Sequence, residues 1–189
     1  MNSNRLLVLS GPSGCGKDTV INELKRRRSD FHLAVSFTTR KPREGEVDGV
    51  NYYFISRREF QRRLKNDRIV EYTEYAGNLY GTPRDELDSQ LTDGHTVVLV
   101  IEVNGAKRVK ELYPEAVTVF LLPPSLEELR FRLDKRGFTN NLAERLEIAK
   151  EEIKLAPTFD RQIVNEDLEE CIQEVSAILD DMMKPLEEE

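Results

Sequence analysis

Arg5-Leu-Leu-Val-Leu-Ser10 and Gly11-Pro-Ser-Gly-Cys-Gly-Lys-Asp18 lie next to each other near the start of the chain and decide its fold. The apolar run indicates a buried strand, and apolar residues at helical spacing in 19–28 indicate a helix. A glycine-rich turn in this context, closed by lysine, is the pattern of a phosphate-binding loop, or P-loop. Its backbone N–H groups and the helix N-terminus favour a phosphate, and Lys17 supplies a mobile positive charge.

The loop departs from the usual pattern at Asp18, because a serine or threonine that binds Mg²⁺ normally follows the lysine. Asp18 offers Mg²⁺ a hard oxygen ligand, directly or through water; alternatively it only caps the first helical turn. The thiol pKa of Cys15 can be depressed at a helix N-terminus, but a small filler residue is the simpler interpretation. The residues expected around the nucleotide phosphates are Gly11, Pro12, Ser13, Gly14, Cys15, Gly16, Lys17, Asp18 and Thr19.

Strand and helix patterns alternate along most of the chain, which predicts an α/β fold with a parallel sheet covered by helices on both faces. Ser56 with Glu59 and Ser125 with Glu128 match capping boxes that open helices. A β-rich segment at 35–92 departs from the alternation and is expected to be an insertion. Strands are predicted at 33–39, 52–55, 69–75, 97–101, 117–122 and 162–164, and helices at 56–65, 83–91, 104–113, 125–136, 142–155 and 167–183.

Composition bounds the functional class. Of 189 residues, 39% are hydrophobic and 33% charged, and no apolar run is long enough for a membrane span or a signal peptide. Cys15 and Cys171 lie far apart without a CxxC motif, which fits a reducing cytoplasm. The whole chain carries −7 and residues 166–189 carry −9, so the other 165 residues carry +2. Nonspecific nucleic-acid binding is therefore not expected, whereas a local site for a small anion is.

Several motifs in the following chain resemble the guanylate kinase family. Ser36-Phe-Thr-Thr-Arg40-Lys-Pro-Arg43-Glu-Gly-Glu-Val-Asp-Gly49 is similar to its S-x-T-T-R-x-P-R-x-G-E-x-x-G stretch. The resemblance spans about residues 5–180, so it covers essentially the whole chain. The other matching segments are Asn51-Tyr-Tyr-Phe54, Glu71, Gly77-Asn-Leu-Tyr-Gly-Thr-Pro83, Leu121-Leu-Pro-Pro-Ser-Leu-Glu-Glu-Leu129 and Lys135-Arg-Gly137.

The resemblance implies a GMP site, and the residue types suit one. Arg40 and Arg43 carry forked guanidinium groups suited to a phosphate, although without the resemblance this basic cluster fits a solvated loop or a nucleic-acid patch equally well. Glu71 can accept hydrogen bonds from N1–H and the exocyclic amine of guanine, a donor pair that adenine lacks on that edge. The family binds the GMP phosphate at the positions of Ser36, Arg40, Arg43, Tyr52 and Tyr80, and the base at those of Glu71 and Thr82.

The resemblance also suggests where metal and phosphoryl group are handled. Glu102 stands where the family usually carries aspartate, at the end of a predicted strand, where it can serve Mg²⁺ or the guanine amine, or else cap the next helix. Asp18 and Glu102 are the candidate metal ligands. Between Gly137 and Arg145 the chain is about two residues shorter than is usual in the family, which leaves the arginine register open. The candidate catalytic residues are Lys17, Arg132, Arg136 and Arg145, each arginine alternatively a surface residue.

The resemblance thus implies a P-loop NTPase-type domain over 4–184 with a core (4–34, 93–133 and 146–184), a GMP-binding insertion (35–92) and a short helical lid (134–145). The implied reaction is ATP + GMP to ADP + GDP, by direct in-line transfer with Mg²⁺. ATP and GMP are the expected partners, with dGMP left open, in a cytoplasmic monomer or homodimer. Two alternatives are a guanylate-kinase-like module that binds without catalysis and a P-loop kinase for another small phosphate.

Overall fold

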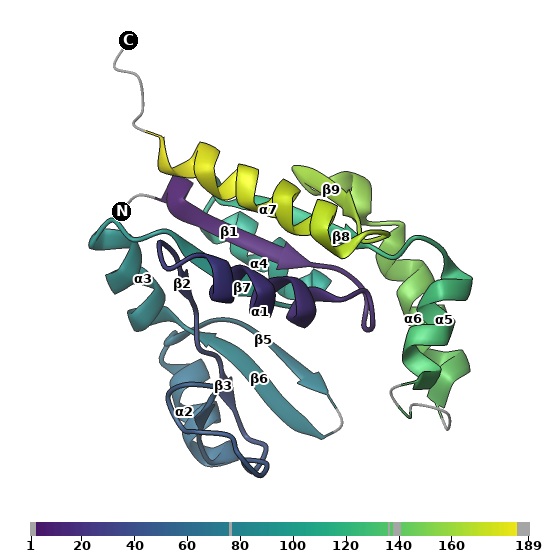
Figure 1. Ribbon diagram of the computed structural model, residues 1–189. Coiled ribbons are helices and arrows are strands. Elements are labelled where there is room, and N and C mark those ends of the chain that lie inside the picture. The colour runs from purple at the N-terminus through teal and green to yellow at the C-terminus, as the bar shows by residue number, and fades with distance from the viewer. Residues whose placement is uncertain (1–2, 76, 136, 138–140, 185–189) are drawn as a thin grey trace.

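The structure is a computed structural model that describes residues 3–75, 77–135, 137 and 141–184, so the candidate Arg136 lies outside the described residues. Two sheets and their flanking helices form the molecule (Figure 1). The strands are β1 (Leu6–Ser10), β2 (His32–Leu33), β3 (Phe37–Thr38), β4 (Tyr53–Phe54), β5 (Ile69–Tyr75), β6 (Asn78–Pro83), β7 (Val97–Val100), β8 (Val117–Leu122) and β9 (Arg161–Val164). The α-helices are α1 (Lys17–Arg27), α2 (Arg57–Lys65), α3 (Arg84–Thr92), α4 (Val103–Leu112), α5 (Leu126–Lys135), α6 (Leu142–Ile153) and α7 (Leu168–Met183), and short 3₁₀ turns are η1 (Ser3–Arg5) and η3 (Ala156–Thr158).

The larger sheet is parallel, with the order β2-β7-β1-β8-β9. Successive side chains of a strand point to opposite faces, so Leu7 and Leu9 of β1 pack with α1 and α7, and Leu6 and Val8 pack with α3 and α4. The three central strands are therefore buried on both faces, which is why β1, β7 and β8 are mostly apolar, whereas the edge strands β2 and β9 carry exposed polar residues. The predicted α/β fold with helices on both faces is confirmed (Figure 1).

The second sheet has the order β4-β3-β6-β5 and mixes one parallel pair with antiparallel pairs. It has its own small core, in which Phe60 of α2 packs on Phe37, Ile69 and Leu79. Val70 of β5 instead belongs to the core beneath α3 and α4. This packing fixes β5 beside α4, and so holds the next residue along the chain, Glu71, against the first turn of that helix.

The segment predicted as one strand at 33–39 is divided between the two sheets, and that prediction was wrong. Leu33 pairs with β7 in the core sheet, whereas Phe37 pairs with β4 and β6 in the second sheet. Strand β6 was not predicted, because its Gly-Thr-Pro end has the composition of a turn. The serine half of each capping box is confirmed, since Ser56 accepts a hydrogen bond from the Glu59 N–H at 3.1 Å and Ser125 one from Glu128 at 3.0 Å. The Glu59 and Glu128 carboxylates instead accept from arginines on their own helices.

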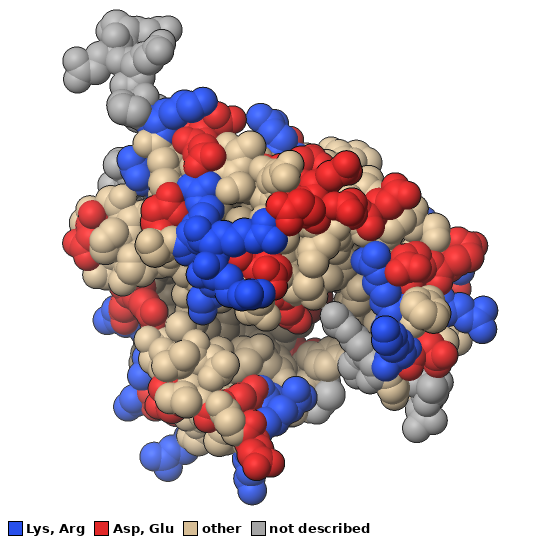
Figure 2. All heavy atoms as spheres, in the orientation of Figure 1, with Lys and Arg blue, Asp and Glu red and all other residues tan. Residues whose placement is uncertain are grey.

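Helices α5 and α6 form a hairpin that stands at the end of the core near the P-loop (Figure 1). Leu129 and Leu133 of α5 pack on Ala149 of α6, and the same leucines fill the space in which a Cβ atom on Gly14 of the loop would lie. The space-filling view is hollowed between this hairpin and the second sheet, beneath the core (Figure 2). Within the described part of the chain, no helix has the length and apolar character needed to cross a membrane.

Candidate active site

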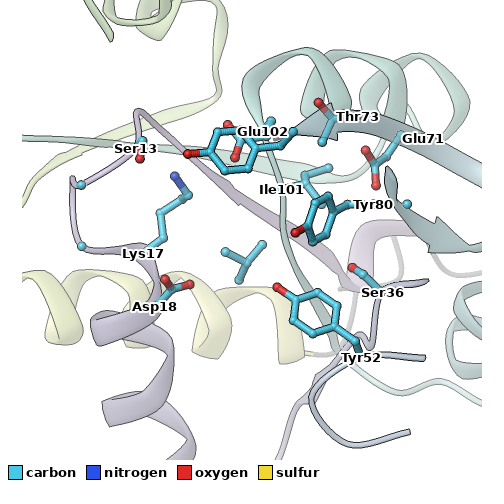
Figure 3. Close-up of a pocket in the computed structure, with 15 residues that line it drawn as sticks. Ser13, Lys17, Asp18, Ser36, Tyr52, Glu71, Thr73, Tyr80, Ile101 and Glu102 are labelled. Atoms are coloured by element: carbon cyan, nitrogen blue, oxygen red, sulfur yellow. The ribbon is translucent and has the colours of Figure 1, made fainter. Parts of the chain in front are cut away.

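One cavity of about 300 Å³ lies where the P-loop, the second sheet and the end of β7 meet. Lys17 and Asp18 line it from the loop side (Figure 3). Glu71 and Tyr80 line it from strands of the second sheet, and Ser36 and Tyr52 from the residues just before β3 and β4. In the close-up, the hydroxyl groups of Tyr52 and Tyr80 point into the space between these two sides (Figure 3). The cavity thus joins the P-loop to a polar wall of the second sheet. Its remaining lining residues are Ser13, Gly14, Gly16, Thr73, Tyr75, Gly81, Val100, Ile101 and Glu102.

The P-loop has the backbone that its glycines permit. Gly16 caps α1 with φ of 106°, and Gly11 has φ of 142°, conformations in which residues with a side chain are strained. A Cβ atom on Gly11 would also lie 2.3 Å from the carbonyl oxygen of Leu121. Lys17 Nζ donates hydrogen bonds to the carbonyl oxygens of Gly11 and, at 3.2 Å, Pro12, so its charge lies inside the curve of the loop.

Asn165 holds the P-loop from behind, and sequence reasoning missed it. Its side chain is buried, and Nδ2 donates to the carbonyl oxygen of Cys15 at 2.8 Å. Arg132 reaches the same carbonyl at 3.4 Å and the carbonyl of Asn165 at 3.2 Å, while its Nε donates to Glu128 at 2.8 Å. Cys15 itself is fully buried, and burial raises the pKa of its thiol, as expected of a filler residue rather than a reactive one.

Arg132 and Arg145 lie on different sides of the loop. Arg132 lines a second cavity of about 510 Å³, together with Thr19, Lys135 and Asn165. Arg145 of α6 donates to Ser13 Oγ at 3.3 Å, and its guanidinium stands 5.2 Å from the ring centroid of Tyr75. Ser13 and Tyr75 both line the first cavity, so Arg145 lies at the edge of that cavity.

Glu71 is the buried charge of the first cavity, with an exposed fraction of 6%. Thr82 donates its hydroxyl to Glu71 Oε1 at 2.6 Å. Thr82 is fully buried and does not line the cavity. Its hydroxyl therefore faces Glu71 and not the space that a ligand would occupy. Burial raises the pKa of the Glu71 carboxyl from 4.5 to about 7.

The basic loop after β3 is organised by Glu46. Arg40 pairs with both Glu46 carboxylate oxygens, each at 2.8 Å, and its guanidinium stands 5.4 Å from the ring centroid of Tyr52. Glu46 also accepts from the Arg43 backbone N–H at 2.7 Å. Hydrogen bonding to Arg40 lowers the pKa of Glu46 to about 2. Arg40 therefore stands beside the cavity wall, whereas the Arg43 side chain is exposed and does not line the cavity.

The two candidate metal ligands both line the first cavity. Asp18 is exposed in the first turn of α1, and Glu102 follows β7 as the residue that precedes α4. Glu152 of α6, which sequence reasoning missed, faces the same region: burial raises the pKa of its carboxyl to about 7, and the nearby charge of Glu102 adds to the rise. Among the described residues no three metal-ligating side chains gather at one point. A pair of carboxylates nevertheless fits Mg²⁺, which takes few protein ligands beside substrate phosphates.

Comparison with known proteins gives one family. The family model described as guanylate kinase matches residues 3–182. The chain is 47% identical to the guanylate kinase of Bacillus cereus strain ZK / E33L over 184 residues, 95% of this chain and 90% of that protein. It is 46% identical to the guanylate kinase of Trichormus variabilis over 94% of this chain and 90% of that protein. The crystal structure of guanylate kinase from Anaplasma phagocytophilum superposes with a TM-score of 0.77 at 39% identity, covering 95% of this chain and 86% of that one.

Proposed function

This chain belongs to the guanylate kinase family, which makes it an ATP:GMP phosphotransferase, and we propose that GMP accepts the phosphoryl group in the cavity between Glu71 and Lys17. The observation that carries this proposal is that one cavity joins a buried carboxylate to a P-loop lysine. A base-reading group and a phosphate-binding group on opposite walls suit a nucleoside monophosphate that lies between them.

Glu71 is the group that recognises the base. Its carboxylate accepts hydrogen bonds from N1–H and the exocyclic amine of guanine, and Thr82 holds it in position from behind. With adenine the same carboxylate would remain buried without that pair of donors, which is a strong penalty against AMP. Support comes from its burial and from the Thr82 hydrogen bond, which leaves Oε2 for the base.

The GMP phosphate is bound by Ser36, Tyr52 and Tyr80, with Arg40 beside them. Arg40 suits this role because Glu46 and the Tyr52 ring orient its guanidinium, so few rotamers are lost when it meets a phosphate. Arg43, whose side chain is exposed on the same loop, is the second guanidinium available to that phosphate. These hydroxyl and guanidinium groups hold the acceptor phosphate facing the P-loop.

ATP occupies the P-loop, and its nucleoside extends into the second cavity beside Arg132 and Asn165. An oxygen of the GMP phosphate attacks the γ-phosphorus of ATP, the bond from that phosphorus to the β-bridging oxygen breaks, and ADP leaves with the electron pair. Lys17 and Arg145 neutralise charge that develops on the migrating group, and the contact of Arg145 with Ser13 supports this assignment. Arg132 holds the loop backbone through the Cys15 carbonyl.

Asp18 and Glu102 are the residues that would hold Mg²⁺ at the ATP phosphates, and Mg²⁺ there supplies further charge neutralisation. The insertion (35–92) and the lid (134–145) close on the core (4–34, 93–133 and 146–184) and exclude water during transfer. Two features support this division: the second sheet has its own small core, and the α5–α6 hairpin touches the P-loop at Gly14.

The test is a coupled assay of ADP release with ATP and Mg²⁺, comparing GMP, dGMP, AMP, CMP and UMP. We expect turnover confined to the guanine nucleotides. A Lys17→Met variant should lose turnover while still binding GMP, which calorimetry measures directly. A folded wild-type protein that binds GMP but turns over none of the five nucleotides would instead support a binding module, and turnover of AMP equal to that of GMP would contradict the role of Glu71.

A further inference from the structure

Gly105 lies in the first turn of α4, directly against the Glu71 side chain. A Cβ atom built on Gly105 would stand 2.5 Å from Glu71 Oε2, 3.1 Å from its Cδ and 3.4 Å from its Cγ. The three nearest atoms thus all belong to one side chain, and no real Cβ atom tolerates the first of these distances. The Glu71 carboxylate therefore occupies the volume that any other amino acid at position 105 would need.

The backbone does not explain this glycine. Gly105 is helical, and it is not among the glycines with positive φ, unlike Gly11 or Gly16 of the P-loop. Alanine is favoured over glycine within helices, because glycine loses more conformational freedom on folding. A Cβ at position 105 should therefore suit the helix itself, and the only conflict is with Glu71.

A Cβ atom at position 105 would displace the Glu71 carboxylate rather than the backbone of the fold. The atom that would be struck is the far end of a flexible side chain, so Glu71 can yield by turning about its own bonds. Its present position is held by the Thr82 hydroxyl at 2.6 Å and by burial between β5 and α4. Rotation of the Glu71 carboxylate would leave the fold intact, but its oxygens would no longer point toward a base in the cavity.

We propose that Gly105 is a specificity-determining residue, whose missing side chain sets the position from which Glu71 reads guanine. The inference rests on the proposed role of Glu71 in base recognition. Gly105 does not contact the nucleotide in this account; it acts as a positioning residue through Glu71. Displacement of a recognition group by about 1 Å is enough to lower the efficiency of an enzyme by about 100-fold.

The experiment compares the wild type with Gly105→Ala in steady-state kinetics and thermal unfolding. We expect kcat/KM for GMP to fall by about 100-fold, the preference for GMP over AMP to shrink, and KM for ATP to stay within about two-fold. The crowded contact should lower the unfolding temperature by no more than about 10 °C and leave the transition cooperative, so kinetics measured well below that temperature report on a folded protein. Lys107→Ala, at an exposed position on the same helix, is the matched control and should leave all of these values unchanged.

Glu71→Asp provides an independent test, because the aspartate side chain is one methylene shorter and its carboxylate lies farther from position 105. If both changes act on one contact, the double variant should lose much less than the product of the two single losses. Independent, multiplicative losses would overturn the inference. Unaltered GMP kinetics in Gly105→Ala with impaired kinetics in Glu71→Gln would overturn it too, while leaving the proposed function intact. Unaltered GMP kinetics in both would overturn the assignment of Glu71 itself.

Discussion

Replacing Glu71 with glutamine tests the consequences of burying a carboxyl group beside Thr82. Burial raises the pKa of Glu71 from 4.5 to about 7 in the folded protein. Between these pH values the folded protein binds more protons than the unfolded chain, so the free energy of unfolding falls as the pH rises through this window. Each pKa unit corresponds to about 1.36 kcal/mol, so the loss is complete above pH 7 and amounts to about 3 kcal/mol.

Glutamine has nearly the same shape, keeps an oxygen that accepts the Thr82 hydrogen bond, and carries no charge. We therefore expect Glu71→Gln to match the wild type near pH 4.5 and to exceed its unfolding free energy by about 3 kcal/mol at pH 8. Urea unfolding followed by circular dichroism at pH 4.5, 6, 7 and 8 measures this difference. A difference between the two proteins that does not grow with pH would refute the claim that Glu71 carries its charge at a cost in stability.

The same variant should lose GMP even as it gains stability. Glutamine offers guanine one acceptor and one misplaced donor, in place of two charged acceptors. At about 1.5–3 kcal/mol for each hydrogen bond to a charged group, kcat/KM for GMP should fall by about two to four orders of magnitude, with KM for ATP unchanged. A variant that is stabilised at pH 8 and still turns over GMP would show that the base is recognised elsewhere.

Three further substitutions test other parts of the site. Arg40→Lys replaces the fork that pairs with both Glu46 oxygens by a single ammonium, and should raise KM for GMP by about ten-fold without changing KM for ATP; equal changes in both constants would contradict this. Asn165→Ala removes the donor to the Cys15 carbonyl and should lower the free energy of unfolding, measured in urea, by about 1–3 kcal/mol. It should also raise KM for ATP more than KM for GMP. A larger rise in KM for GMP would contradict the placement of Asn165 on the ATP side of the site. Asp18→Ala should raise the Mg²⁺ concentration needed for half-maximal rate. An unchanged Mg²⁺ dependence would contradict a metal-binding role and leave Asp18 only a role at the first turn of α1.

Local sequence signals predicted the parts of the molecule that depend on neighbours along the chain. The P-loop, the apolar strands of the core sheet and the boxes at Ser56 and Ser125 are set by backbone conformation and spacing over a few residues. The strand predicted at 33–39 failed because each half pairs with a different sheet, which is a property of the tertiary fold. Strand β6 was missed because its pairing with β5 outweighs its turn-like composition.

Contacts across the fold could not be predicted in this way. Asn165 reaches the carbonyl of Cys15, which lies 150 residues earlier in the chain, and nothing near it in sequence signals that contact. Glu152 lies among ordinary charged residues of α6, and only burial near Glu102 distinguishes it. Sequence alone likewise gave Arg132 and Arg145 the same role, whereas their contacts assign Arg132 to the back of the P-loop and Arg145 to Ser13 at the front.

The central claim is that Glu71 reads guanine from the position fixed by Thr82 and Gly105, and a crystal structure of the protein with GMP bound tests it most directly. We expect both Glu71 carboxylate oxygens within about 2.6–3.2 Å of the guanine N1 and exocyclic amine nitrogens. The GMP phosphate should meet Tyr52, Tyr80 and the Arg40 guanidinium. A guanine base bound away from Glu71, with that carboxylate still bonded to Thr82 alone, would contradict the account.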